Sequence, residues 1–492
     1  MNILQKIQQE RALYKHQETK EILNMFSKKT RNVPVVDFFS KKGLICELKK
    51  ASPSKGIINS SERLEDVIIE YIQGGAERFS VLTEQNHFLG NWRFLHELKN
   101  QHPEKGFLRK DFLFTKEDIH ESWLIGADAV LLIAEMLDTA LMELLIAEAH
   151  NKGLQVLCEA HSNSELERIL NLNELPDAIG INSRNLMTFQ VNNRVPFALK
   201  QRIPENIPVV AESGVRDAFF TRLAGNAGFH AVLIGETLMR SDNRLLTIQE
   251  MLSAYEKGRV EKPCFFSLLM KRFNRNPGMK YIPGLKYKPG LKYKPLVKIC
   301  GITKTLDAEI VVAAGADVLG FILAPSKRQI SILDLEKFAE YDVLKVAVVK
   351  DPDAAQISML RKLLTKGIID GVQFHGNESL ELVQSFGGNA YKAISLESPE
   401  EVADDLFAPL SLYDKPKGAL NDSLGLSFDA SFQEVLQGGF IAGGISPQNL
   451  SGMLKMCSPL LIDIASGVEK SPGVKDRVKI KEIFSILENM YG

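Results

Sequence analysis

Glu47 and Lys49 stand two residues apart at the end of a short apolar run that begins at Leu44. Side chains of a strand alternate between its faces, so these two would project to the same side. A carboxylate and an ammonium that face one interior are costly unless they pair or take part in proton transfer. Small, polar and turn-forming residues follow at 51–56, which predicts that the strand ends at a mouth lined with hydroxyl groups. Taken alone, the stretch leaves two interpretations open, an ion pair that fills a barrel interior and a catalytic pair.

Polar and ionisable side chains end other short apolar runs of the first half in the same way. In a barrel of parallel strands the carboxyl ends meet at one rim, and catalytic groups collect there. Six of these runs would bring together two lysines, several carboxylates and an amide. Packing alone does not readily explain such a convergence. Opposite charges crowded together also shift one another's pKa values, which suits proton transfer. The residues concerned are Glu47, Lys49, Glu84, Lys110, Glu159, Asn182, Arg184, Glu212 and Ser213.

Eight apolar runs in the first half must position these side chains. They recur at intervals of a strand plus a helix, and spacers such as 116–126 and 138–153 carry helical periodicity. This alternation predicts an α/β fold of parallel strands with crossover helices, and eight units favour a (β/α)8 TIM barrel. An open doubly wound sheet, the second possibility, would need a glycine-rich turn after its first strand, where the chain has Ser52-Pro53-Ser54. The expected strands are 44–49, 79–83, 107–111, 129–133, 154–159, 178–182, 208–212 and 231–234, after a charged N-terminal helical extension over 1–29.

Two glycine-containing turns follow the last two of these runs, at 212–215 and 234–237. Backbone N–H groups in such turns bind anions, and the loops after strands seven and eight of TIM barrels frequently hold a phosphate group. With Ser52 at the same rim, we expect a phosphate-binding site there.

The composition is that of a globular protein of two or three domains, with 492 residues, 45% hydrophobic and 25% charged. Lys and Arg total 60 and Asp and Glu 61, and the net charge of -1 argues against a nucleic-acid or membrane-surface protein. The five cysteines are widely separated and form no CxxC pair, which predicts free thiols in a reducing compartment. Residues 1–10 lack a signal-peptide core and no apolar stretch has the length of a membrane span, so we expect a cytoplasmic protein.

Five motifs of the first half together resemble indole-3-glycerol-phosphate synthase, over about residues 41 to 239: 47–56, Leu82-Thr83-Glu84, Arg109-Lys110-Asp111-Phe112, 180–186 and Ala211-Glu212-Ser213-Gly214. The resemblance implies that Lys110 is the general acid of ring closure, Lys49 the second acid in dehydration, and Glu159 the general base. Loss of carbon dioxide and water would then give the indole. By the same resemblance, positioning and polarising roles fall to Glu47, Asn182 and Glu212, and substrate or phosphate binding to Ser52, Phe112, Arg184, Ser213, Gly214, Gly235 and Glu236.

Three near-copies of one hexapeptide, beginning at Pro277, Pro283 and Pro289, separate the two halves. Pro and Gly at such short intervals oppose helix formation and predict an extended or turn-rich connector. A basic, tyrosine-containing nucleic-acid patch is the functional alternative, but enzyme-like neighbours on both sides favour a plain linker. We therefore expect domains at 1–257 and 296–492, joined by a linker over 258–295.

A second series of eight apolar runs fills the C-terminal half and predicts a second TIM barrel in tandem with the first. The tripeptide Gly-Ala-Asp precedes a run in both halves, at 126–128 and 315–317. A shared fold does not imply a shared reaction, so the second site needs its own interpretation. The expected strands are 296–300, 318–323, 344–349, 371–374, 391–394, 410–413, 440–442 and 460–464.

Chemically capable side chains end these runs as well. Cys300 ends the first run; although most free cysteines are small buried hydrophobes, Lys298 beside it favours a lowered pKa and a reactive thiolate. Arg328, after the second run, could pair with a substrate carboxylate. The other candidates are Gln373 and His375 at the end of the fourth run, Asp414 after the sixth, and Gly443, Gly444, Ser466 and Gly467 in glycine-rich turns after the last two, which predict a second phosphate site.

Three motifs make the second half similar to phosphoribosylanthranilate isomerase, over about residues 296 to 484: Lys298-Ile299-Cys300-Gly301, Gln373-Phe374-His375-Gly376 and Ser466-Gly467-Val468-Glu469. The resemblance implies an Amadori rearrangement. Cys300 would take a proton from the second carbon of the sugar, Asp414 would protonate the ring oxygen, and Arg328 would hold the anthranilate carboxylate. The chain departs from the family after the sixth run, where Asp422-Ser423-Leu424-Gly425 replaces the usual Gly-Gly-Thr-Gly. The missing glycines restrict the approach of backbone to a ligand, and Asp422 adds negative charge near a phosphate.

The two resemblances together imply a bifunctional enzyme of tryptophan biosynthesis in which the product of the second barrel is the substrate of the first. Neither reaction needs a metal or another cofactor, and no cluster of His, Cys and carboxylate residues at ligand spacing stands out. We expect phosphorylated small-molecule substrates, no nucleic-acid or membrane partner, and a monomer.

Three alternatives stay open. The second barrel could be degraded and structural, which isomerase turnover by a 296–492 fragment would eliminate. Both barrels could be phosphosugar isomerases or epimerases, which an absence of carbon dioxide release would support. The chain could bind nucleic acid through 277–294, which retention on a nucleic-acid column, lost on deletion of those residues, would support.

Overall fold

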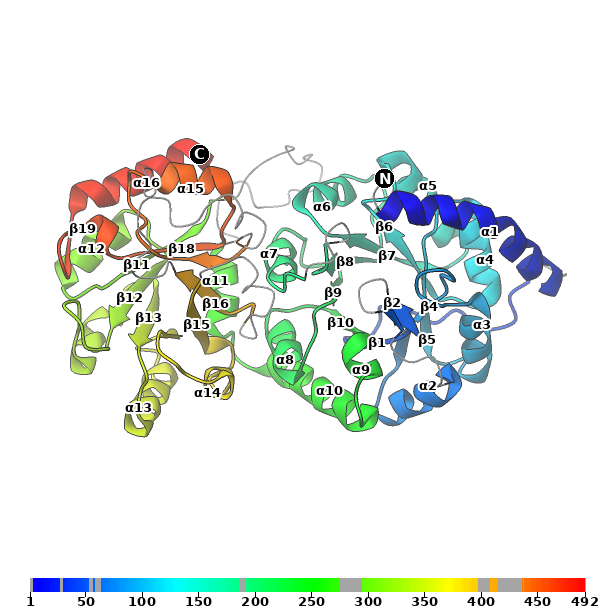
Figure 1. Ribbon diagram of the computed structural model, residues 1–492, viewed down its shortest axis with the longest axis horizontal. Coiled ribbons are helices and arrows are strands. Elements are labelled where there is room, and N and C mark those ends of the chain that lie inside the picture. Colours follow the sequence, from blue (N-terminus) through cyan, green and yellow to red (C-terminus); the bar gives the residue numbers. More distant parts are fainter. Residues whose placement is uncertain are drawn as a thin grey trace. The chain divides into compact units, whose positions relative to one another are not determined.

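The computed structural model of the chain describes residues 3–26, 30–52, 56–57, 63–185, 191–273, 294–396, 408–414, 436 and 438–491. The described chain forms two compact units, one ending at Glu261 and the other beginning at Lys262 (Figure 1). Each unit contains one closed barrel of eight parallel strands. The expected architecture of two tandem TIM barrels is therefore confirmed.

The strands of the first barrel pair in the order β1-β10-β9-β8-β7-β6-β5-β4, so that the first and the last strand close the ring. Each of the eight expected runs is a strand, with ends that move by at most two residues. The strands are β1 (Gly43–Leu48), β4 (Arg78–Leu82), β5 (Gly106–Lys110), β6 (Ala129–Ile133), β7 (Gln155–Ala160), β8 (Ala178–Asn182), β9 (Val209–Glu212) and β10 (Ala231–Ile234), with a small rim hairpin of β2 (Ala51–Ser52) and β3 (Gly56–Ile57).

Helices connect these strands around the outside of the ring (Figure 1). Several begin at the capping residues that the sequence provides, including Thr115, Asp138 and Ser162, whose side chains accept backbone N–H groups of the first turn. The helices are α1 (Ile3–Met25), α2 (Leu64–Gln73), α3 (Trp92–Gln101), α4 (Lys116–Ile125), α5 (Thr139–Asn151), α6 (Asn163–Leu170), α7 (Val195–Lys200), α8 (Ala218–Asn226), α9 (Glu236–Met239) and α10 (Arg244–Val260).

Strand alternation determines which residues of the first barrel face its interior. Apolar side chains from successive strands, among them Ile45, Leu108, Leu157 and Val210, form one buried cluster inside the ring. The inward position two residues further along each of these strands lies at the carboxyl rim. That position is occupied by Glu47, Lys110, Glu159 and Glu212.

Helix α1 is attached to the outside of the first barrel by buried ion pairs. Arg109, which points outward between the inward residues Leu108 and Lys110, donates to Glu18 of α1 at 3.1 Å. Arg11 lies 3.0 Å from Asp111, and Lys15 lies 2.6 Å from Asp118 of α4. The charges of the N-terminal extension therefore lie against the strand that carries Lys110.

The strands of the second barrel pair in simple sequence order, β11 to β18, and β18 closes on β11. They are β11 (Leu296–Cys300), β12 (Val318–Ile322), β13 (Leu344–Val349), β14 (Gly371–Phe374), β15 (Ala390–Ser395), β16 (Ser411–Asp414), β17 (Phe440–Ile441) and β18 (Leu461–Ile464). The surrounding helices are α12 (Thr305–Ala313), α13 (Ala354–Thr365), α14 (Leu380–Gln384), α15 (Leu450–Met456) and α16 (Arg477–Tyr491), with 3-10 turns η1 (Ile332–Phe338), η2 (Gly387–Asn389) and η5 (Ser466–Val468) and a hairpin of β19 (Glu469–Ser471) and β20 (Val474–Lys475).

Residues expected in the linker belong to the second unit instead. Helix α10 continues to Val260, and α11 (Phe265–Phe273) covers the amino-terminal end of the second barrel. Phe265 stacks on Tyr391 near the start of β15, with 5.7 Å between ring centroids, and Phe266 lies 6.3 Å from Phe440 at the start of β17. The linker over 258–295 is therefore too long, because its first part is an aromatic cover for the second barrel. The hexapeptide repeats up to residue 293 lie outside the described residues.

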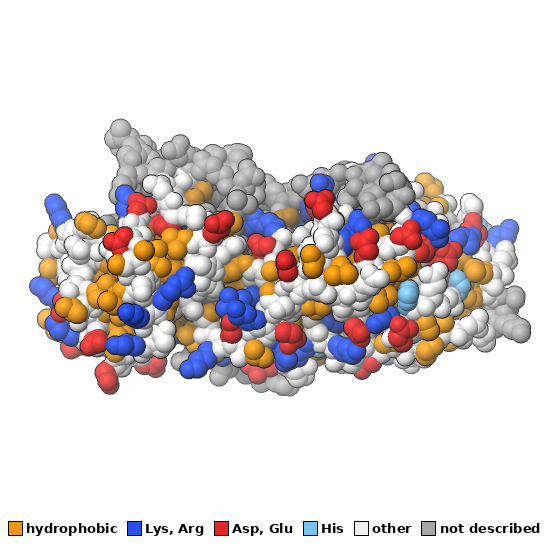
Figure 2. Space-filling model, turned by 90° about the horizontal axis from the view of Figure 1, so that it is seen from below, with side chains coloured by type: hydrophobic (Ala, Val, Ile, Leu, Met, Phe, Trp, Pro, Cys, Tyr) orange, Lys and Arg blue, Asp and Glu red, His pale blue; other side chains and the backbone are white. Residues whose placement is uncertain are grey.

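Charge and hydropathy of the described surface are unremarkable. On the face shown in Figure 2, Lys and Arg side chains alternate with Asp and Glu side chains, in keeping with the near-zero net charge. Among the helices of the described residues, none is both long enough and apolar enough to cross a membrane.

Candidate active sites

Lys110 is the centre of the first site, because three carboxylates from other strands face its ammonium group. Its Nζ lies 2.7 Å from Glu212 Oε2, 3.5 Å from Glu159 Oε2 and 4.0 Å from Glu47 Oε2. Lys49 Nζ lies 2.7 Å from Glu47 Oε1. The structure thus brings together at one rim five of the seven ionisable residues that the sequence predicted for this site.

The solvent exposure of the lysine side chains distinguishes the two interpretations of the Glu47–Lys49 pair, an ion pair that fills the barrel and a catalytic pair. The lysine side chains keep contact with solvent, with 14% of Lys49 and 17% of Lys110 exposed, whereas the carboxylates lie beneath them. An ion pair that merely filled the barrel would be closed on both sides. These ammonium groups instead line an open mouth, as a site for an anionic substrate requires.

The charges of this cluster act strongly on one another. Burial opposes the charge of Lys110, but the carboxylates of Glu212, Glu159 and Glu47 outweigh it and raise the pKa of the ammonium group. Burial also favours the neutral acid of Glu159, but Lys110 and His161 outweigh it and lower the pKa of Glu159 below its usual range. For Glu212, burial and the nearby charge of Glu159 prevail over Lys110 and raise the pKa to about 8. At neutral pH one carboxyl group is ionised and the other is protonated, which is the division between a base and an acid.

Hydrogen bonds orient the two carboxyl groups. Asn182 Nδ2 donates to Glu159 Oε1 at 3.2 Å. Among the described residues, the buried atoms Glu159 Oε2 and Glu212 Oε1 have no hydrogen-bond donor. A Cβ atom at Gly180 would collide with the carboxyl group of Glu212, so this glycine makes the position of Glu212 possible. A proton on Glu212 allows the two carboxyl groups to share a hydrogen bond, in addition to the bond that Lys110 donates to Glu212 Oε2.

The expected phosphate-binding residues lie in three adjacent loops. Ser213 and Gly214 both have positive φ, 63° and 70°, and Asn193 donates to the Gly214 carbonyl at 3.2 Å. Positive φ is unusual for serine and typical of functional turns. Gly235 adjoins the catalytic pair, since a Cβ atom there would lie 2.8 Å from Lys49 Nζ. Burial lowers the pKa of Arg184, and the nearby carboxylates of Glu236 and Glu47 act in the opposite direction. Because Arg184 is close enough to interact with both carboxylates, it lies among these loops.

Three other predicted residues have different surroundings. Phe112 is buried beside Phe88, with 6.4 Å between ring centroids, at the apolar side of the mouth. Glu84 turns away from Lys110 and accepts the backbone N–H groups of 86–88, so it shapes a loop. The backbone of Ser52 forms β2, but its side chain lies outside the described residues.

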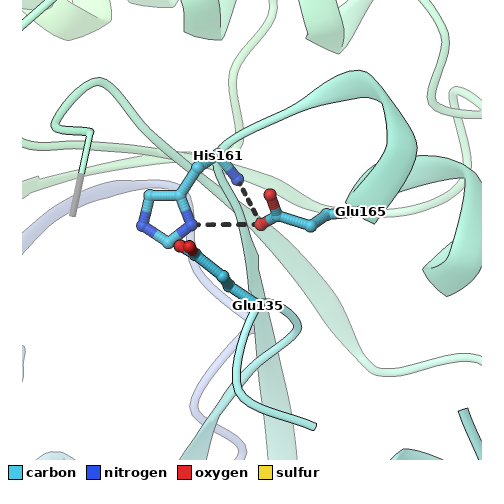
Figure 3. A group of neighbouring side chains, drawn as sticks. All are labelled: Glu135, His161 and Glu165. Carbon is cyan, nitrogen blue, oxygen red and sulfur yellow. Dashed lines mark hydrogen bonds and ion pairs between the residues drawn. The ribbon is translucent and has the colours of Figure 1, made fainter. Parts of the chain in front are cut away.

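The sequence-based interpretation missed His161 and Glu165 beside the catalytic carboxylate. His161 Nε2 lies 3.1 Å from Glu159 Oε1, and His161 Nδ1 lies 3.1 Å from Glu165 Oε2. Glu135, from the loop after β6, approaches the same ring (Figure 3). The four-residue spacing of His161 and Glu165 across the start of a helix was the available signal. The three residues are close enough to share a cation, but Nδ1 and Glu165 Oε2 lie 3.1 Å apart, the distance of a direct hydrogen bond, so we assign no metal to them.

The second site gathers around Cys300 at the end of β11. A Cβ atom at Gly320 of β12 would lie 2.8 Å from Cys300 Sγ and 2.8 Å from Lys298 Cε, so the thiol and the lysine stem share one space. Lys298 Nζ lies 2.6 Å from Asp463 and also donates to Gln373. Burial raises the pKa of Cys300, and Lys298 opposes this without prevailing. The expectation that Lys298 gives the thiol a lowered pKa is therefore wrong, because desolvation is the larger effect.

Polar contacts connect Gln373 to Asp414 across three strands. Gln373 Nε2 lies 3.3 Å from His375 Nδ1, and His375 Nε2 lies 3.6 Å from Asp414 Oδ2. Cys300 and Asp414 are the last residues of β11 and β16. Because all eight strands are parallel, both lie at the same end of the barrel.

Arg328 is held in place by a carboxylate that the sequence analysis did not single out. Arg328 Nε lies 3.0 Å and 2.9 Å from the two oxygens of Glu469, and Nη2 lies 2.9 Å from Oε2. Lys475 pairs with the same carboxylate at 3.0 Å. The guanidinium group is thus fixed on one edge, with its other edge available to a ligand.

The second pair of glycine turns also comes together. Gly443 and Gly444 have positive φ, 95° and 66°, and Asn449 donates to the Gly444 carbonyl at 2.9 Å. A Cβ atom at Gly467 would collide with the carbonyl group of Ile445, so Ser466 and Gly467 lie directly against this turn. The departure at 422–425 lies outside the described residues.

Two TIM barrels, each with proton donors and acceptors at its carboxyl rim, define the chain as two enzymes on one polypeptide. The family model for indole-3-glycerol phosphate synthase matches residues 3–251, and that for N-(5'phosphoribosyl)anthranilate (PRA) isomerase matches residues 297–486. The chain belongs to the indole-3-glycerol phosphate synthase family and carries, in tandem, a domain that matches the PRA isomerase model.

Individual relatives are similar to one half or to both halves of the chain. A multifunctional tryptophan biosynthesis protein of Schizosaccharomyces pombe is 26% identical over 499 residues, which cover 93% of this chain and 61% of that protein. The chain thus spans less than two thirds of that relative. The indole-3-glycerol phosphate synthase of Endomicrobium trichonymphae is 38% identical over 249 residues, 50% of this chain and 95% of that enzyme. The phosphoribosyl anthranilate isomerase of Thermus thermophilus has 31% identity, a TM-score of 0.34, and covers 39% of this chain and 98% of its own.

Proposed function

We propose that the first barrel closes the indole ring of a carboxyphenylamino-deoxyribulose phosphate. Lys110 donates a proton to the substrate carbonyl as the carboxylate-bearing ring carbon attacks, Lys49 protonates the departing hydroxyl group, and Glu159 accepts the proton that the newly closed ring loses on dehydration. Carbon dioxide and water leave. The convergence of the Glu159 and Glu212 carboxyl groups on the Lys110 ammonium group, at 3.5 Å and 2.7 Å, is the observation that carries this assignment.

The remaining residues of the first rim orient the substrate. Asn182 and Glu47 hold Glu159 and Lys49, and Phe112 packs against the aromatic ring. The phosphate group lies against the loops after β8, β9 and β10, which supply Arg184, Ser213, Gly214, Gly235 and Glu236, and Ser52 after β1 belongs to the same site. Two positive-φ residues and a glycine beside Lys49 support this placement.

For the second barrel we propose the preceding isomerisation, in which a phosphoribosylanthranilate opens its furanose ring and becomes an aminoketose. Cys300 takes the proton from the second sugar carbon, and Asp414 protonates the ring oxygen. Arg328 holds the anthranilate carboxylate with its free edge, and Gln373 and His375 line the space between Cys300 and Asp414. Gly443, Gly444, Ser466 and Gly467 receive the phosphate.

One experiment tests both steps. Purified chain is supplied with phosphoribosylanthranilate alone, and the formation of indole-3-glycerol phosphate and of carbon dioxide is followed. The product is expected only if both barrels act in succession. Accumulation of the aminoketose would remove the synthase assignment, and unchanged substrate together with turnover of added aminoketose would support a degraded second barrel.

We further propose that the chain is a cytoplasmic monomer that binds no nucleic acid. The five cysteines are free and buried, which suits a reducing compartment. The mixture of charges on the face in Figure 2 offers no basic stripe among its described residues.

A further inference from the structure

His161 stands behind the catalytic carboxylate of the first barrel, with each ring nitrogen facing an acid. Nε2 lies 3.1 Å from Glu159 Oε1, and Nδ1 lies 3.1 Å from Glu165 Oε2. A lone pair on either nitrogen would repel the oxygen it faces. Two carboxylates at these distances favour a proton on each nitrogen, and hence an imidazolium ring.

The start of helix α6 holds Glu165 in place. Ser162 is the N-cap residue and accepts the backbone N–H of Glu165, while its hydroxyl donates to Glu165 Oε1 at 2.5 Å. The backbone N–H of His161 donates to Glu165 Oε2 at 2.9 Å (Figure 3). This reciprocal arrangement of Ser162 and Glu165 anchors the carboxylate that in turn orients the imidazole ring.

The two oxygens of Glu159 are consequently used differently. Oε1 meets Asn182 and His161, whereas Oε2 faces Lys110 and has no hydrogen-bond donor among the described residues. A base that removes a proton needs one free lone pair at a defined place.

We propose that His161 is a positioning residue of the first active site, an imidazolium that holds Oε1 of Glu159 and leaves Oε2 free to accept the substrate proton. This inference rests on the proposed function, because it gives His161 a part in the same ring closure. Burial opposes the charge on His161, but Glu159 and Glu165 outweigh it and raise its pKa to about 10.

Several other charged groups act on this pair and set the direction of any pH effect. Removing the cationic ring should raise the pKa of Glu159, because an opposite charge at this distance favours the ionised form. The groups that face Glu159 are Lys110 from β5, Glu47 from β1, Glu212 from β9 and His161. Those that face His161 include Glu135 after β6 and Glu165 of α6. Arg168 of α6 donates to the carbonyl groups of Ala134 and Leu137.

The kinetic test compares His161→Gln with Glu135→Gln in the full chain. In His161→Gln the acid limb of the kcat profile for ring closure is expected to move to higher pH by about 1 to 3 units. Glu135→Gln removes a negative charge from the same cluster without removing a donor to Glu159, so its acid limb should stay or move slightly to lower pH. The fluorescence of Trp92 and Trp123, both in the first barrel, reports that this barrel is folded in each variant. An unchanged acid limb in His161→Gln, or an equal shift in both variants, would overturn the proposal.

A second measurement does not depend on turnover. Nitrogen-15 spectra of the histidine-labelled chain, wild type against His161→Gln, identify this ring among the nine histidines. Both nitrogens are expected to remain protonated from pH 6 to about 9, well above the usual histidine pKa. A neutral tautomer at pH 7.5 would overturn the imidazolium. Absence of ring closure by the wild type would instead reject the proposed function and with it the role of His161, whatever the spectra show.

Discussion

The carboxyl group of Glu212 lies 2.7 Å from the ammonium group of Lys110, although its pKa is raised to about 8. Glu159 faces the same ammonium from 3.5 Å and is ionised. Glu47 is paired with Lys49, and Glu159 faces Lys110, so an ionised Glu212 would add a negative charge without a cation of its own. The proton on Glu212 is therefore part of the arrangement that binds an anionic substrate.

Glu212→Gln should mimic the protonated acid. Below pH 7 the variant is expected to keep ring closure with a loss smaller than the roughly 10²-fold that removal of a general acid or base costs. In the wild type, kcat/KM should fall as pH rises through about 8, because ionised Glu212 then adds a negative charge to the site. The variant should lack this fall. Identical basic limbs in the two proteins would show that Glu212 is not the titrating group.

Lys110→Ala and Cys300→Ala should separate the two activities. Lys110→Ala is expected to reduce ring closure by roughly 10²- to 10⁴-fold while isomerisation continues, because each site is built from its own barrel. Cys300→Ala should have the reverse effect. The untouched activity reports that the other barrel is intact, and the circular dichroism spectrum of each variant reports that the substituted barrel is folded. Loss of both activities in a folded variant would contradict the two-site assignment.

Arg328→Ala should weaken substrate binding in the second barrel more than it slows the reaction. Its guanidinium group is fixed by Glu469 and offers its free edge to a carboxylate. Loss of a charged hydrogen bond of about 1.5–3 kcal/mol would raise the KM of the isomerase roughly 10-fold or more. Glu469→Gln, which keeps the shape but weakens the anchor, should raise KM less. A fall in kcat at constant KM would place Arg328 in the chemistry and not in binding.

Asp118→Asn should destabilise the first barrel at neutral pH. Burial opposes the charge of Asp118, but Lys15 and Arg11 outweigh it and lower its pKa well below the usual value. We expect a loss of about 1–3 kcal/mol in the free energy of unfolding, less than the roughly 3–5 kcal/mol of a fully buried pair, because 19% of the Lys15 side chain is exposed.

The pH dependence of this loss has a definite sign. A carboxyl group with a depressed pKa stabilises the fold above its unfolded pKa of about 3.9, and the contribution is lost as pH falls through the folded pKa. The difference between wild type and Asp118→Asn should therefore shrink between pH 5 and pH 3. Trp92 and Trp123, both in the first barrel, are the two tryptophans of the chain, so their fluorescence follows this barrel alone. Glu117→Gln, exposed on the same helical turn, is the matched control and should change little.

Most of the fold could be predicted because period-2 apolar runs alternate with helical segments throughout both halves. The same alternation predicted which rim side chains converge, since Glu47, Lys110, Glu159 and Glu212 each stand two residues after an interior apolar residue. The closure of the eight strands into a barrel could be predicted without knowledge of individual side-chain contacts.

What could not be predicted depended on contacts between distant segments. Helix α11 carries only an apolar pattern, and nothing in that pattern tells which barrel it covers. The role of His161 depends on a helix cap that turns Glu165 toward the ring. The pKa of Cys300 depends on burial, which the neighbouring Lys298 cannot reveal from sequence.

The aromatic cover formed by α11 determines how the isomerase half should be expressed on its own. A truncation that starts at residue 296 would remove Phe265 and Phe266 and expose Tyr391 and Phe440 to water. Such a product is expected to aggregate for reasons unrelated to catalysis. A fragment that starts at Lys262 would retain this cover. Inactivity of the fragment that starts at residue 296 would therefore not show that the isomerase barrel is inactive in the full chain.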